Sequence, residues 1–143
     1  MKSIETSTNR VIIAKIQPNE EIISTLIEIV KKHDIKSGLI NIIGALKKVT
    51  LGYYEIKKKN YNFTTFEEDV ELLSCMGNIA YNENEPIIHL HCIVGKEDYS
   101  LVGGHLGQPS IISVTGEVYI YETYIRIKRI YNDKFRVSLL NLL

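Results

Sequence analysis

Residues 86–106 read PIIHLHCIVGKEDYSLVGGHL, and this stretch has the pattern of a β-hairpin that carries three of the chain's 4 histidines. Alternate side chains of a strand point to opposite faces, so a strand over residues 87–94 places His89 and His91 on one face. Cys92 falls on the other face among apolar neighbours, which predicts that this second face packs against a core. The two imidazoles then start about 7 Å apart at the backbone, a distance from which both can reach one ion.

The third histidine of the stretch, His105, follows a Gly103-Gly104 pair. The polar segment 96–99 allows the chain to reverse, so residues 101–106 can return beside the first strand and bring His105 to the other two. The glycines permit a close approach between neighbouring chains. Three neutral imidazoles suit zinc, nickel, copper or iron(II), and three protein ligands leave zinc one position for water or substrate. The alternative is a hydrogen-bonded histidine pair without a metal.

The rest of the chain predicts a single α+β domain over residues 1–143, with a largely antiparallel central sheet. Apolar residues at helical spacing predict one amphipathic helix over residues 19–33. This helix has Glu20 and Glu21 in its first turn and His33 in its last turn, which suits the helix dipole. One early helix followed by many short strands is typical of an α+β domain. The strand candidates are residues 10–17, 39–43, 48–56, 70–81, 87–94, 110–121 and 123–130.

Composition limits the function classes. Lys plus Arg and Asp plus Glu are 17 each, and this zero net charge counts against a surface that neutralises many phosphates. The two cysteines, Cys75 and Cys92, lie in apolar segments without disulfide-like spacing, which predicts buried free thiols. No stretch resembles a signal peptide or the roughly 20 apolar residues of a membrane helix. We therefore expect a cytoplasmic protein that is not bound to a membrane.

The histidine stretch also resembles a known family. H-L-H followed by V-G-G-H-L resembles the motif of the PPC (plants and prokaryotes conserved) domain, and three further segments agree in order. The similarity covers about residues 10–130. The matching segments are 43–51 (I-G-A-L-x-x-V-x-L), 71–77 (E-I-L-S-L-S-G in the family), 89–91, 102–106 and 115–118 (the late A-E-V segment).

The resemblance implies an α+β fold that assembles as a homotrimer. For members with the three histidines it implies a divalent metal, zinc, bound by residues matching His89, His91 and His105. The family's descriptive label implies a DNA-binding or regulatory role. In plant members a separate AT-hook with the sequence R-G-R-P contacts DNA, whereas this chain contains no R-G-R-P. Glu71 and Glu117 match acidic positions of the family. We expect the side chain of each either to be an exposed carboxylate or to orient an imidazole that binds the metal.

Three functions therefore stay open at the level of sequence. The first is a trimeric metal-binding module with a regulatory or DNA-associated role. The second is a metal-dependent enzyme that acts on a small molecule at the open coordination position, with Glu71 or Glu117 as an acid or base. The third is a structural trimer whose histidines only pack at the interface. No pattern in the sequence identifies a catalytic residue.

Overall fold

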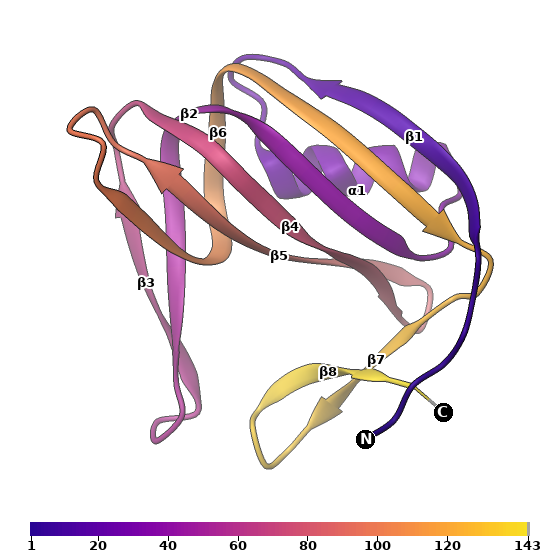
Figure 1. Cartoon of the computed structure of the whole chain (residues 1–143). Coiled ribbons are helices and arrows are strands. Elements are labelled where there is room, and N and C mark those ends of the chain that lie inside the picture. Colours follow the sequence, from indigo (N-terminus) through magenta and orange to yellow (C-terminus); the bar gives the residue numbers. More distant parts are fainter. Residues whose placement is uncertain (143) are drawn as a thin grey trace.

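The computed structural model describes residues 1–142 and confirms a single α+β domain. Figure 1 shows a curved sheet with one helix, α1, against one of its faces, while the β2–β3 and β7–β8 hairpins extend away from the sheet. No helix within residues 1–142 is long and apolar enough to cross a membrane. The elements are β1 Thr8–Ile16, α1 Ile22–Lys32, β2 Gly38–Glu55, β3 Asn60–Phe66, β4 Val70–Asn82, β5 Glu85–Gly95, β6 Leu101–Thr123, β7 Lys128–Asn132 and β8 Val137–Asn141.

Within residues 1–142 the sheet has 8 strands: β3-β2-β6-β5-β4-β7-β8 follow one another in this order, and the remaining strand, β1, pairs with β6. Every pairing is antiparallel except a short parallel contact between β4 and β7. Because β2 pairs with both β6 and β4, and β5 joins these two, the four strands close into a ring of pairings. The long β6 reaches β5 with its first residues and lies between β1 and β2 with its last ones.

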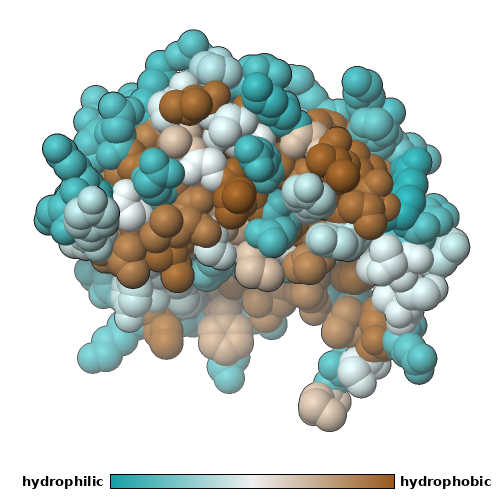
Figure 2. Space-filling view, turned by 45° about the horizontal axis from the view of Figure 1, so that its top comes forward, coloured by the Kyte–Doolittle hydropathy of each residue, from teal (hydrophilic) through white to brown (hydrophobic). Residues whose placement is uncertain are grey.

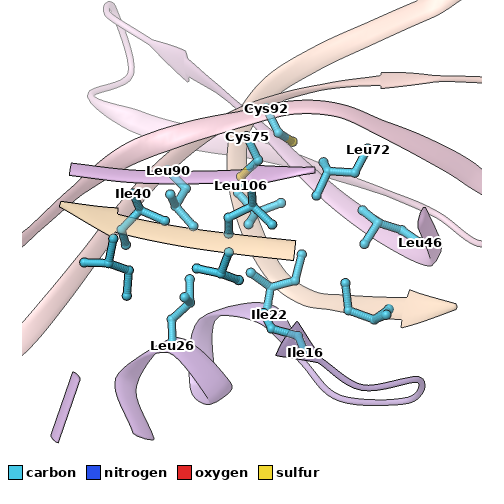
Figure 3. Packing of buried hydrophobic residues seen from close by; sticks show 14 of the residues in the cluster. Ile16, Ile22, Leu26, Ile40, Leu46, Leu72, Cys75, Leu90, Cys92 and Leu106 are labelled. Carbon is cyan, nitrogen blue, oxygen red and sulfur yellow. The ribbon is translucent and has the colours of Figure 1, made fainter. Parts of the chain in front are cut away.

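The core lies between the sheet and α1. Ile22, Leu26 and Val30 recur every four residues, so they share the face of α1 that is buried. They pack against alternate residues of the sheet strands, among them Ile40 and Leu90 (Figure 3). Burial of this kind contributes roughly 1.5–3 kcal/mol for each large apolar side chain. The face of the sheet that points away from α1 is here named the outer face.

The two cysteines are free and buried within this core, as the sequence predicts. Cys75 of β4 and Cys92 of β5 are directly paired across the two strands (Figure 3). The burial of Cys92 confirms that the core face of β5 is the one opposite His89 and His91.

The helix is shorter than its sequence pattern predicts. It begins at Ile22 rather than at residue 19, because Asn19 has a positive φ of 73° and cannot belong to a right-handed helix. Glu21 is therefore the N-cap residue and not part of the first turn, and its carboxylate accepts a hydrogen bond from the backbone N–H of Ser24. His33 is the exposed C-cap residue.

Several predicted strand boundaries are wrong. The breaks expected at Gly44 and at residues 107–109 are irregularities in pairing inside the continuous strands β2 and β6. Such bulges bend a strand without ending it. The strand expected over residues 123–130 starts only at Lys128. The strands β3 and β8 were not predicted, because β3 is mostly exposed and lacks a pattern of alternating buried residues.

A buried carboxylate joins β1 to the rest of the domain. Glu122 is only 1% exposed, and its oxygens accept hydrogen bonds from Arg10 Nε at 2.6 Å, Asn9 Nδ2 at 3.1 Å and the backbone N–H of Lys36 at 2.8 Å. Burial alone would raise the pKa of Glu122, but the hydrogen bonds from Lys36 and Arg10 outweigh it and the pKa is lowered.

We expect Glu122→Ala to lower the free energy of unfolding by about 3 kcal/mol, because it leaves several buried donors without their acceptor. Urea unfolding of both proteins at pH 7 measures this difference. A carboxyl whose pKa is lower in the folded state stabilises the fold above its unfolded pKa. The difference between the two proteins should therefore shrink as the pH falls through the folded pKa of Glu122. An unchanged difference in acid would contradict this account.

Candidate metal centre

Two neighbouring strands bring three imidazoles together on the outer face. His89 and His91 alternate along β5, and His105 of β6 is paired directly with His91. The ring centroids of His89 and His91 and of His89 and His105 are 5.0 Å apart, and those of His91 and His105 are 5.4 Å apart. One nitrogen from each ring lies within 4.8 Å of the other two, so the group could hold a metal ion. The hairpin predicted from the sequence therefore exists.

Gly103 and Gly104 allow β6 to lie close to its neighbours, as predicted. A Cβ atom on Gly103 would lie 2.7 Å from the carbonyl oxygen of Cys92, and one on Gly104 would lie 2.8 Å from that of Gly52. Both distances are shorter than an ordinary contact, so a side chain at either position would push β6 away from β5 or β2. The glycine pair thus sets the distance at which His105 faces His91.

The environment keeps two of the three rings neutral. Partial burial, together with the positive charge of Arg129, lowers the pKa of His89 to about 4. Partial burial likewise lowers the pKa of His105 to about 4, with smaller contributions from His91 and Arg129. A neutral imidazole has a free lone pair on one nitrogen, which is the form that binds a metal. At neutral pH, the rings of His89 and His105 are therefore uncharged, which is the charge state of a metal-binding imidazole.

Aromatic side chains of β3 cover His105. The ring of Tyr61 lies 4.5 Å from that of His105, and the ring of Phe63 lies 6.2 Å from it. This wall removes water from one side of the site and contributes to the burial that lowers the pKa of His105. Sequence reasoning missed both residues because it did not predict β3. The alternation of aromatic residues in YNF was the one available signal.

Arg129 of β7 is a charged residue in direct contact with His89. Its Nη2 lies 2.9 Å from Nδ1 of His89 and donates to Asn78 Oδ1 at 3.0 Å, and its Nη1 donates to the carbonyl oxygen of Ser138 at 2.8 Å. Metal-binding histidines usually donate from their second nitrogen to a carboxylate or carbonyl, whereas this nitrogen of His89 faces a donor. Nothing in the sequence around Arg129 points to this contact, because the β4–β7 pairing that places it is long-range.

The donor atoms fit a metal of intermediate softness. Nδ1 of His105 is buried and has no hydrogen-bond partner within residues 1–142, and such a buried polar atom is costly unless a ligand satisfies it. Three neutral nitrogen donors suit zinc, and suit magnesium or calcium poorly because those ions prefer oxygen.

Glu71 and Glu117 lie together, but elsewhere on the outer face. Both line a depression of about 440 Å³ with Leu73 and Val114, and no histidine lines it. Within residues 1–142 neither carboxylate forms a hydrogen bond or ion pair with a side chain. In the single chain they are thus exposed carboxylates, and a role in orienting a ligand imidazole stays a prediction.

Comparison with known proteins identifies the chain's relatives. A "putative DNA-binding protein" from Bacteroides thetaiotaomicron has 33% identity and a TM-score of 0.88, over 96% of this chain and 97% of that one. A plant- and prokaryote-conserved (PPC) protein from Pyrococcus horikoshii has 28% identity and a TM-score of 0.90, over 100% and 99%. A metal-containing protein from Archaeoglobus fulgidus has 25% identity and a TM-score of 0.90, over 99% of both chains.

None of the curated proteins compared with the chain matches it. The family model of the Plants and Prokaryotes Conserved (PCC) domain matches residues 3–123, which include all three histidines of the site. The fold agrees with this match, and the chain belongs to the Plants and Prokaryotes Conserved (PCC) domain family.

Proposed function

We propose that the protein is a homotrimeric metal-binding protein in which His89, His91 and His105 bind one divalent ion per chain, and that this ion is zinc. The observation that carries the proposal is the group of three nitrogens within 4.8 Å of one another. The structurally similar protein from Archaeoglobus fulgidus is described as metal-containing, which supports it. Zinc is favoured because it accepts three neutral imidazoles and a fourth, exchangeable ligand.

The outer face supports assembly of several copies. It is rich in apolar side chains that are about half exposed in the single chain, and Figure 2 shows such patches between hydrophilic residues. Contiguous exposed apolar surface is typical of protein interfaces. Strand pairing places Met76 beside His91, so the metal centre and the apolar surface adjoin. The apolar residues of this face are Val11, Ile13, Leu39, Ile43, Leu73, Met76, Ile93, Val114, Tyr119 and Tyr121.

A regulatory role on DNA is the second part of the proposal. It is supported by the description of the Bacteroides thetaiotaomicron protein as a "putative DNA-binding protein". Lys57, Lys58 and Lys59 lie at the exposed turn between β2 and β3, and trimer formation would multiply this basic turn threefold. Because the chain as a whole has no net charge, a contact with phosphates needs a local group of basic residues, and this turn provides one.

The free thiols of Cys75 and Cys92 fit a reducing compartment, so we place the protein in the cytoplasm.

The alternative function is a metal-dependent enzyme that acts on a small molecule. It is supported by the three-ligand site, because a bound zinc ion with an open position polarises a carbonyl or lowers the pKa of a water. Such an enzyme needs a general acid or base within reach of the ion. Within residues 1–142 no carboxylate forms a hydrogen bond or ion pair with the three histidines, so metal binding ranks before catalysis.

Metal analysis of the purified protein tests the proposal. We expect one zinc ion per chain by elemental mass spectrometry, and a particle of three chains by light scattering. The same preparation should bind duplex DNA at low salt, and the affinity for DNA should fall as the salt concentration rises. Protein that contains no metal after exposure to zinc would refute the metal site. A monomeric particle would refute the assembly, and absent DNA binding at low salt would remove the role on DNA.

A further inference from the structure

The guanidinium of Arg129 is buried, and residues 1–142 supply no acidic partner for it. Arg129 is only 7% exposed, and its side-chain partners, His89, Asn78 and the carbonyl of Ser138, are all neutral. No ion pair links Arg129 to a carboxylate within residues 1–142, and its Nε is buried without a hydrogen-bond partner. Buried charges in proteins are usually paired, because moving a lone charge out of water is costly.

The charge of Arg129 acts on the metal centre. Its Nη2 lies 2.9 Å from Nδ1 of His89, so the positive charge lies directly beside one of the three proposed ligands. Within residues 1–142, no carboxylate forms a hydrogen bond or ion pair with any of the three histidines. A divalent ion on the three neutral imidazoles would therefore share the site with a second positive charge, and no carboxylate of the described chain would balance them.

We propose that the metal centre takes a small oxyanion of the carboxylate type at its open coordination position, and that Arg129 stabilises the negative charge of this ligand. The inference rests on the proposed metal site and adds the class of ligand that the site selects. A depression of about 280 Å³ lies beside His91 and leaves room for a small molecule, while Arg129 lies outside its lining, beside His89. Its lining includes Ser74, Gly103 and Gly104 and, within the described chain, no acidic residue.

This feature lies outside the part of the chain that defines the family. The family model ends at residue 123, whereas Arg129 lies on β7, in the hairpin formed by residues 128–141. The hairpin is anchored by the pairing of Tyr81 with Lys128 and by a hydrogen bond from the Tyr54 hydroxyl to the carbonyl of Phe135. Arg129 is therefore supplied by a part of the chain that the family model does not match.

Acetate and acetamide test the inference, because they have nearly the same shape and differ in charge. The protein loaded with cobalt(II) should change its visible absorption spectrum on titration with acetate and respond at least about tenfold more weakly to acetamide. Arg129→Gln should weaken acetate binding about tenfold, which corresponds to about 1.4 kcal/mol. Arg129→Lys keeps the charge and should stay within about threefold of the wild-type protein. Arg126→Gln is the matched control, since Arg126 lies over the ring of Tyr81.

The metal affinity, measured by competition with a chelator, separates the possible outcomes. Loss of a positive charge should leave the cobalt affinity of Arg129→Gln unchanged or higher. If cobalt and acetate affinities both fall, Arg129 only holds His89 in place and the inference is overturned. Equal acetate affinity in wild type and variant also overturns it, while the metal site stands. If the variant does not fold, equal responses of the wild-type protein to acetate and acetamide overturn the inference. A wild-type protein that binds no metal refutes the proposed function itself.

Discussion

Replacing His105 with alanine is expected to lower the zinc affinity of the protein by more than about 100-fold, because it leaves only the two imidazoles of β5. Loss of a residue that merely supports a ligand costs about 10–100-fold in affinity, so loss of a ligand should cost more. The rings of the three histidines are close enough to share one ion, and His105 is the only one of them on β6. Competition with a chromophoric chelator at pH 7.5 measures the affinity.

Two further variants make the His105 experiment specific. His105→Phe removes the nitrogens but keeps an aromatic ring against Tyr61 and Phe63, so it should lose zinc and remain folded. His33→Ala removes the histidine at the C-cap of α1, far from the site in the fold, and should bind zinc like the wild-type protein. Wild-type zinc affinity in both His105 variants would show that the three-histidine assignment is wrong.

The parts of the site that the sequence predicts are those set by local geometry. Strand alternation is enough to place His89 and His91 on one face and Cys92 on the other, and a short polar turn returns the chain to His105. The same reasoning predicts an α+β domain with a single helix. The beginning of that helix was wrong because the sequence pattern does not reveal the positive φ of Asn19.

The remaining parts of the site depend on contacts between distant segments. Tyr61 reaches His105 only because β3 pairs with β2, and β2 pairs with β6. Arg129 reaches His89 because β7 pairs with β4 in parallel, a connection that no local pattern encodes. The family resemblance suggested Glu71 and Glu117 as candidates to orient a ligand imidazole, whereas the fold places both in a depression of the outer face that no histidine lines. Long-range pairing, rather than residue type, therefore decides which charges act on the three histidines.

The outer face provides the second large effect: Val114→Asp is expected to convert the proposed trimer into monomers. Val114 is 66% exposed in the single chain, so a carboxylate there should hardly change the stability of the isolated fold. In an assembly that buries this face, the variant would place an unpaired charge beside Leu73, Glu71 and Glu117. Burial of such a charge costs several kcal/mol, which raises a dissociation constant by more than about 1000-fold. Light scattering measures the mass of the particle.

Ile56→Asp is the matched control for this experiment, because Ile56 is 73% exposed and follows β2, away from the residues of the outer face. It should remain trimeric, whereas a trimeric Val114→Asp protein would contradict the proposed interface. The monomeric variant should still bind one zinc ion per chain, since β5 and β6 of the same chain supply all three histidines. If zinc were lost together with the trimer, a fourth protein ligand would have to come from a second copy. The coordination position that we assign to an oxyanion would then be occupied by protein.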